Sequence, residues 1–198
     1  MKYAGTQLYG MDVVLRDMEE ADVERIVDYW HENDAGFLQS LGVDPRKFVS
    51  KDETKRRLLS STAQDDSDRT RAYFIVSSGR ELIAYTNLNF RSRDEAVAHF
   101  HVLKKGIRSK AIAYQLFLDA VKAFFNNFPI NVVVMETSPE NERINHFLQR
   151  FGLTPRKEHI ANPDGMARPG EFNVYEIHRE DYLRTLAYMN SVEAQKRS

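Results

Sequence analysis

The chain has 198 residues, of which 42% are hydrophobic and 29% charged, a composition typical of one globular domain spanning residues 1–198. Its 28 basic and 29 acidic residues nearly cancel, which argues against nucleic acid as a partner. The absence of cysteine excludes disulfides, thiol nucleophiles and cysteine-ligated metal centres. Residues 1–10 lack the apolar run of a signal peptide, and no segment has the ~18 apolar residues of a membrane span. We therefore expect a cytoplasmic protein with no membrane partner.

The period of the apolar residues predicts strands and helices in alternation along the chain. The expected strands are at residues 11–15, 73–76, 82–89, 96–103, 130–135, 157–160 and 171–178. The expected helices are at residues 18–33, 51–63, 112–125, 139–151 and 179–194, with one more helix start at Asp44–Pro45. Short polar turns join strands 73–76, 82–89 and 96–103, which predicts an antiparallel meander. The fully apolar strand at 130–135 follows a long helix and predicts a parallel crossover.

Local signals set the ends of several helices. Asp17 precedes a methionine and two glutamates, a pattern that predicts an N-cap and an acidic first turn. Ser138 and Pro139 predict the start of a later helix, and Gly152 predicts its end. Trp30 lies at helical spacing from the other apolar residues of the first helix, so we expect it in the core and not at a ligand.

The segment with most chemical information opens the helix after strand 96–103. It consists of Arg108, Ser109, Lys110, Ala111, Ile112 and Ala113. The first amides of a helix are unpaired donors at the positive end of its dipole, and small side chains let a ligand approach them. With two basic side chains added, such a start suits an anion such as pyrophosphate. The same residues are also typical of an ordinary helix start with solvated basic side chains.

The order of the elements and this segment together resemble the GNAT superfamily of acyl-CoA-dependent N-acyltransferases. The family's pyrophosphate signature is Arg/Gln-x-x-Gly-x-Gly/Ala, and Arg108 to Ala113 match it except at Ala111, which replaces the usual glycine. Asn141 to Gly152 is similar to the family's Asn-x-x-Ser/Ala segment ending in Gly-Phe, with the spacing of the ribosomal-protein (RimJ/RimL-like) branch. The resemblance implies an α/β (α+β) GNAT fold: a mixed, mostly antiparallel sheet of about seven strands with a central splayed parallel pair, flanked by helices.

The resemblance also implies acetyl-CoA as co-substrate and no metal. The pyrophosphate would bind at Arg108 to Ala113, and the pantetheine amides would pair with the backbone of Val102 and Leu103 as an added strand would. An amide of the same segment would polarise the thioester carbonyl. Asn141 would contact the pantetheine arm from the other side, although a polar residue at a helix start also serves the helix itself.

His99 and His101 are the candidates for the catalytic base, because the acceptor amine must lose a proton before it attacks the thioester. They lie two residues apart on one strand and therefore share a face of the sheet, and imidazole titrates near neutrality. Each could instead be a histidine that is only hydrogen-bonded on a half-buried face. Two histidines could begin a metal site, but no third ligand has suitable spacing, so we expect no metal.

We expect direct transfer of an acetyl group to a primary amine, a peptide N-terminus or a small amine, in a ternary complex, since no cysteine can carry a covalent intermediate. Leu148 occupies the position where many members of the superfamily have the tyrosine that protonates the leaving thiolate. The thiolate would then leave unprotonated, or Ser138 or water would supply the proton. This departure keeps open an alternative, a catalytically silent acyl-CoA-binding regulatory module. The acyl chain length stays open, as does a homodimer.

The cofactor placement predicts that Arg108→Glu weakens acetyl-CoA binding, because the substitution puts a negative charge beside the pyrophosphate. Isothermal titration calorimetry with acetyl-CoA measures this affinity directly. An affinity equal to that of the wild-type protein would exclude the placement.

Overall fold

A computed structural model describes residues 2–8, 11–63, 70–104, 110–163, 165–182 and 184. They belong to two compact units. The first comprises Met1–Asn33 and Val49–Pro129, and the second comprises Asp34–Phe48 and Ile130–Ser198. The chain therefore leaves the first unit after Asn33 and returns to it at Val49.

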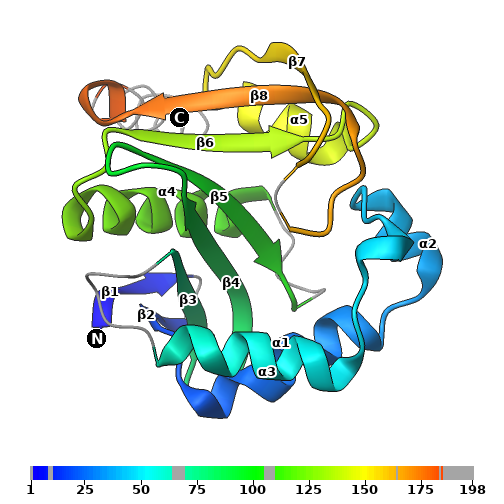
Figure 1. Cartoon of the computed structure of the whole chain (residues 1–198). Coiled ribbons are helices and arrows are strands. Elements are labelled where there is room, and N and C mark those ends of the chain that lie inside the picture. Colours follow the sequence, from blue (N-terminus) through cyan, green and yellow to red (C-terminus); the bar gives the residue numbers. More distant parts are fainter. Residues whose placement is uncertain are drawn as a thin grey trace. The chain divides into compact units, whose positions relative to one another are not determined.

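The first unit contains five strands in the order β1-β2-β3-β4-β5, each antiparallel to its neighbour (Figure 1). Their bounds are β1 Lys2–Leu8, β2 Met11–Asp17, β3 Arg71–Ser78, β4 Glu81–Phe90 and β5 Glu95–Val102. The predicted meander of β3, β4 and β5 is confirmed. The sequence did not predict β1, because residues 2–8 are mostly small or polar, and it is the pairing with β2 that makes them a strand.

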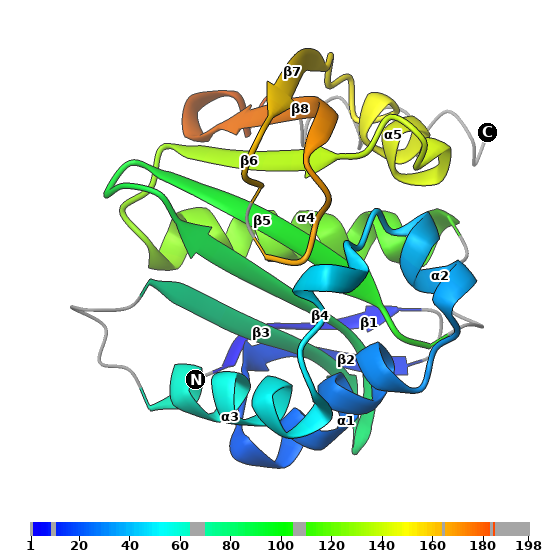
Figure 2. The ribbon, with the colours of Figure 1, turned by 45° about the vertical axis from the view of Figure 1, so that its right-hand side comes forward.

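Helices cover both faces of this sheet (Figure 2). One face packs against α4, Lys110–Asn127: Phe74 of β3 is fully buried, and its ring centroid lies 5.3 Å from that of Phe124. The other face packs against α1, Glu20–His31, and α3, Lys51–Thr62, where Ile75 of β3 joins a buried cluster with Ile26 and Leu58. Adjacent residues of β3 thus face opposite helices, as the alternation of a strand requires.

The helix α1 begins later than predicted. Its N-cap is Glu19 and not Asp17, and Glu19 forms a capping box with Asp22. Asp17 remains in β2, where it pairs with Phe74 and accepts a hydrogen bond of 2.6 Å from the Tyr3 hydroxyl. The pairing of β2 with β3 therefore extends past the residue that the cap pattern favoured. The helix ends at His31, two residues before the predicted end.

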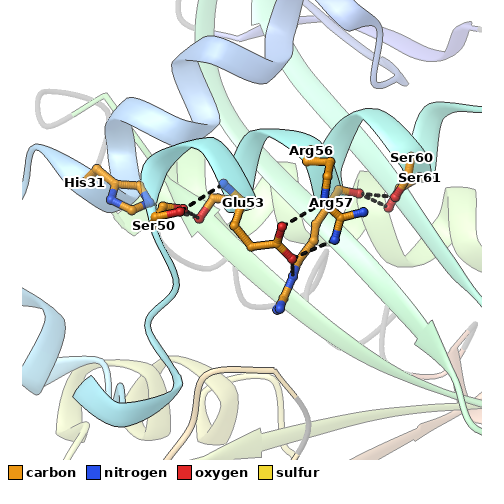
Figure 3. A network of polar contacts seen from close by, with 8 residues as sticks. His31, Ser50, Glu53, Arg56, Arg57, Ser60 and Ser61 are labelled. Carbon is orange, nitrogen blue, oxygen red and sulfur yellow. Dashed lines mark hydrogen bonds and ion pairs between the residues drawn. The ribbon is translucent and has the colours of Figure 1, made fainter.

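The helix α3 packs on the sheet through Leu58, its one buried residue, and the half-buried Leu59, and the rest of its surface is polar. The Ser50 hydroxyl caps its start by accepting a hydrogen bond from the backbone N–H of Glu53 (3.2 Å). Figure 3 shows the Glu53 carboxylate reaching the guanidinium groups of Arg56 and Arg57, each at 2.7 Å. Ion pairs to α1, such as Lys55 with Glu24 at 2.6 Å, join the two helices. The predicted helix at 51–63 is thus confirmed, with electrostatic contacts in place of a broad apolar face.

The second unit contains three strands in the order β6-β8-β7, all antiparallel. Its elements are α2 Ala35–Ser40, the 3₁₀ helix η1 Pro45–Lys47, β6 Val132–Thr137, α5 Glu142–Gln149, β7 Arg156–Ile160 and β8 Gly170–His178. The helix start at Asp44 and the strands β7 and β8 are as predicted, whereas α2 was not predicted. The strands β5 and β6, for which a parallel crossover was predicted, belong to different units.

The segment 34–48 is attached to the second unit by backbone hydrogen bonds. Val43 forms a β-bridge with Ala167, and the N–H of Asp44 donates to the carbonyl of Met166 (2.7 Å). The guanidinium of Arg168 donates to the carbonyl of Val43 (3.0 Å). These contacts explain why a segment that follows α1 in sequence belongs to the unit that contains β8.

The helix α5 begins at Glu142 and not at Pro139 as predicted. Asn141 is its N-cap, and the preceding Pro139 and Glu140 form a turn. Gly152 has a φ of 77°, a conformation that favours glycine, so the predicted end is confirmed. Residues 179–182 and 184 are helical, which confirms the start of the predicted closing helix, while the rest of 179–194 lies outside the described residues. Within the described part of the chain, no helix is long and apolar enough to cross a membrane.

Candidate active site

His99 and His101 both face α1 and α3, as their spacing predicts. In the register of β4 and β5, Tyr85 is opposite His101 and Asn87 is opposite His99. Phe100, between the two histidines, faces the other way, and its ring contacts Phe117 of α4. The two histidines therefore occupy neighbouring places on one side of the sheet, next to an aromatic residue and an amide.

The imidazole of His101 is enclosed by aromatic rings. It stacks on Tyr85 with a centroid distance of 4.7 Å, and its centroid lies 5.0 Å from that of Trp30 and 5.7 Å from that of Tyr29. Burial and, to a smaller extent, the neighbouring His99 together lower the pKa of His101 to about 3. His101 is therefore neutral at physiological pH, and its imidazole is a weak base.

Trp30 and Tyr85 form the wall of this enclosure. The indole Nε1 of Trp30 donates a hydrogen bond to the Tyr85 hydroxyl (2.8 Å), and burial raises the pKa of Tyr85 well above its ordinary value. Trp30 packs against the buried cluster under α1, as the periodicity of this helix predicted. The hydroxyl of Tyr85 therefore stays protonated and serves the packing of α1 on the sheet.

The surroundings of His99 are polar. The Nε2 atom of His99 lies 3.5 Å from the side-chain nitrogen of Asn89, and the side-chain nitrogen of Asn87 donates to the Asn89 amide oxygen (3.2 Å). Asn87 and Asn89 are 8% and 9% exposed, whereas His99 is half-buried. The buried amides of Asn87 and Asn89, which we call the polar row, lie beside the half-buried imidazole of His99. Such groups can bind and orient a polar ligand.

The backbone of β5 alternates between its two edges. The N–H of Leu103 donates to the carbonyl of Ile83 in β4 (2.9 Å), so residues in phase with Leu103 direct their backbone groups toward β4. Val102, one residue earlier, pairs in register with Ala84 of β4. Of the two residues expected to pair with pantetheine, Leu103 therefore already uses its N–H within the sheet.

The helix α4 begins at Lys110, so Lys110, Ala111, Ile112 and Ala113 form its first turn. The N–H groups of a first turn have no partner within the helix and lie at the positive end of its dipole. Ile112 is 8% exposed and Ala113 is half-buried. Arg108 and Ser109 lie outside the described residues, as do the side chains of Lys110 and Ala111.

Asn141 and Leu148 lie at the two ends of α5. The Asn141 side-chain oxygen accepts a hydrogen bond from the N–H of Ile144, at the long distance of 3.4 Å. Its side-chain nitrogen makes no hydrogen bond to any residue that the structure describes. Leu148 is fully buried, so the position of the family's tyrosine is part of the core. Asn141 therefore caps the helix weakly and retains donors for a ligand.

The sequence gave no indication of a buried polar cluster next to Asn141, which we call the Asn145 network. Its members are Thr137 of β6, Asn145 of α5, and Asn173 and Tyr175 of β8, all at most 8% exposed. The side-chain oxygen of Asn145 accepts hydrogen bonds from the other three side chains at 2.6 to 3.0 Å. One feature of the sequence could have indicated this network: Asn145 is polar but lies three positions before Leu148, and therefore on the buried side of α5.

The sequence matches one family of known domains, described as the acetyltransferase (GNAT) domain, over residues 12–154. The chain belongs to the GNAT acetyltransferase family. This confirms the predicted GNAT fold and identifies the protein as an acyltransferase. The described residues form eight strands where about seven were predicted, the additional one being β1.

Solved structures show the same fold. A RimL ribosomal L7/L12 α-N-protein acetyltransferase in complex with coenzyme A is 14% identical to this GNAT protein, with a TM-score of 0.70, covering 90% of this chain and 98% of that one. A spermidine N-acetyltransferase from Vibrio cholerae, in complex with CoA and spermine, is 18% identical, with a TM-score of 0.69 and coverage of 86% and 98%. An uncharacterized protein from Bacillus halodurans is 13% identical, with a TM-score of 0.69 and coverage of 94% and 96%.

A comparison of the sequence with curated proteins gives no match. Among the residues that the structure describes, no three His, Asp or Glu side chains are grouped so that they could hold a metal ion. Because no curated protein matches, the GNAT assignment depends on the family match and on the fold.

The enclosure of His101 predicts a pH dependence of stability. The folded state binds the imidazole proton only near pH 3, whereas the unfolded chain binds it below about pH 6.5. The free energy of unfolding should therefore fall as the pH drops below about 6.5, by up to about 1.4 kcal/mol per pH unit, and be unaffected by this group above that pH. Urea denaturation between pH 5 and 8 should show a shallower fall for His101→Phe, and equal slopes for the two proteins would contradict the prediction.

Proposed function

We propose that this GNAT protein is an acetyl-CoA-dependent N-acetyltransferase that transfers the acetyl group to a primary amine by direct attack in a ternary complex. The family match over residues 12–154 carries the proposal, because it includes β5, the first turn of α4 and Asn141. The related structures with CoA bound are consistent with acetyl-CoA as co-substrate. No covalent enzyme intermediate is needed, because a neutral amine can attack the thioester directly.

In the first unit, the proposed cofactor contacts are made by the start of α4 and the end of β5. The first-turn N–H groups of α4, with Arg108, Ser109 and Lys110, would bind the pyrophosphate. The pantetheine arm would pair with the backbone of Val102 and Leu103 as an added strand does. An amide of the same segment would polarise the thioester carbonyl.

In the second unit, Asn141 is the proposed ligand of the pantetheine arm. Its side-chain nitrogen has no hydrogen bond to a described residue, and its capping bond is long at 3.4 Å. A free amide donor suits the carbonyl groups of pantetheine. The role of Asn141 as an N-cap is compatible with this contact, because the cap uses the side-chain oxygen and the ligand would use the nitrogen.

We assign the base to His99, acting directly or through a water molecule. A base with a pKa near 3, such as His101, takes a proton from an ammonium ion poorly. His99 instead lies beside the polar row of Asn87 and Asn89. One ammonium proton would go to His99, the amine nitrogen would then attack the thioester carbon, and the C–S bond would break with its electron pair on sulfur. The second nitrogen proton would reach the thiolate through solvent.

The acceptor is proposed as a peptide N-terminus or a small amine. The related enzymes act on a ribosomal protein and on spermidine, so the fold accommodates both classes. Leu148 cannot donate a proton, so the thiolate would leave unassisted by this residue, which a fairly acidic thiol tolerates. A homodimer stays a prediction.

Release of free CoA tests this function. With acetyl-CoA and a panel of peptides with free N-termini, spermidine and simple primary amines, a thiol reagent should report CoA only when an acceptor is present. Acetyl-CoA should also raise the melting temperature. A rise in melting temperature without thiol release by any amine would favour the silent acyl-CoA-binding module instead.

The assignment of the base predicts that His99→Gln lowers kcat/KM by about 100-fold, and most strongly at low pH, where the amine is hardest to deprotonate. His101→Gln serves as the matched variant on the same strand and should change the pH profile much less. A wild-type profile for His99→Gln, or a larger effect of His101→Gln, would contradict the assignment.

A further inference from the structure

The side chain of Asn145 uses all of its hydrogen-bonding groups inside the second unit. Its nitrogen donates to the carbonyl oxygens of Ser138 (2.8 Å) and Asn141 (2.9 Å). Its oxygen accepts from Thr137 (2.6 Å), Asn173 (2.9 Å) and Tyr175 (3.0 Å). Asn145 therefore joins the turn before α5 to the strands β6 and β8 through one buried amide.

These hydrogen bonds divide into two sets with different partners. The two bonds from the nitrogen reach backbone atoms of the turn 138–141, and the three bonds to the oxygen reach side chains on the strands. The other hydrogen bonds of the turn are local: the N–H of Asn141 donates to the Ser138 carbonyl (3.0 Å), the N–H of Glu142 to the Glu140 carbonyl (2.9 Å) and the N–H of Glu140 to the Ser138 hydroxyl (3.3 Å). These local bonds shape the turn, whereas the Asn145 side chain joins it to side chains on the two strands.

The backbone of Asn141 is fixed by this arrangement while its side chain is not. The Asn141 carbonyl accepts from both the backbone and the side chain of Asn145, which turns it inward. The Asn141 side chain, half-buried and weakly bonded to Ile144, points its nitrogen at no described residue. The direction of the donor on Asn141 is therefore set through its backbone.

We propose that Asn145 is a positioning residue for acyl-CoA binding: its side-chain nitrogen holds the turn 138–141 so that Asn141 presents its amide to the pantetheine arm. This inference rests on the proposed function, in which Asn141 contacts pantetheine. Asn145 itself is 5% exposed and saturated, so it acts through Asn141 and not on the ligand.

The substitution Asn145→Asp separates the two sets of hydrogen bonds. A carboxylate keeps the acceptors for the three strand side chains but replaces the donor that faces two carbonyl oxygens. We expect the Kd and the KM for acetyl-CoA to rise about fivefold, the weight of one hydrogen bond, with kcat at saturating acetyl-CoA unchanged. If this variant does not fold, Asn145→Ala removes both sets of hydrogen bonds without adding a charge, and its affinity is compared with that of Tyr175→Phe, which loses a strand-side bond alone.

Tyr175→Phe is the matched control. It removes one strand-side hydrogen bond and leaves both bonds to the turn, so it should lower the melting temperature without changing acetyl-CoA affinity. An Asn145→Asp protein with wild-type affinity would overturn the inference. Equal losses of affinity in Asn145→Asp and Tyr175→Phe would also overturn it, because the effect would then come from general loss of packing.

A double-mutant cycle with Asn141→Ala tests the route of the effect. If Asn145 acts through Asn141, the double variant should bind acetyl-CoA no more weakly than Asn141→Ala alone, whereas fully additive losses would overturn the inference. Adenosine 3′,5′-bisphosphate, which lacks the pantetheine arm, should bind wild-type and Asn145→Asp proteins equally. Failure of the wild-type protein to bind acetyl-CoA would instead overturn the proposed function, and the inference with it.

Discussion

The alternation of β5 is the constraint on which the first unit of this protein depends. Phe100 packs against α4, while His99 and His101 face α1 and α3. The N–H of Leu103, just past the strand, bonds to β4. One short strand therefore presents an aromatic ring to α4 and two histidines to the opposite side of the sheet, because successive side chains alternate between its two faces.

Two histidines of the same strand have different chemistry because their neighbours differ. His101 is enclosed by Tyr29, Trp30 and Tyr85, and the lack of water around it disfavours the charged imidazole. His99 lies among amides. The aromatic residues come from α1 and β4, so the packing of a helix on the sheet makes the His101 imidazole a weak base.

In the second unit, one buried amide connects the turn before α5 to two strands. Most polar groups of the Asn145 network are hydrogen-bonded to one another or to the backbone. This lowers the free-energy cost of burying its four polar side chains. It also explains why α5 begins after Asn141: the carbonyls of Ser138 and Asn141 turn inward to Asn145. The cap pattern at Ser138 could not predict this later start. It depends on the Asn145 side chain, whose position is set by strands that are distant in sequence.

The sequence by itself determined the order of most elements and the shared face of the two histidines, because these depend on local periodicity and on spacing along the chain. The family was indicated by the resemblance of two of its segments to family motifs. It could not determine β1, whose polar sequence becomes a strand only by pairing with β2, or the start of α1, where pairing of Asp17 with β3 outweighs a local cap pattern. The neutral state of His101 and the saturation of Asn145 were decided by tertiary structure alone, since both depend on side chains that are far apart in sequence and meet only when the sheet and its helices have packed.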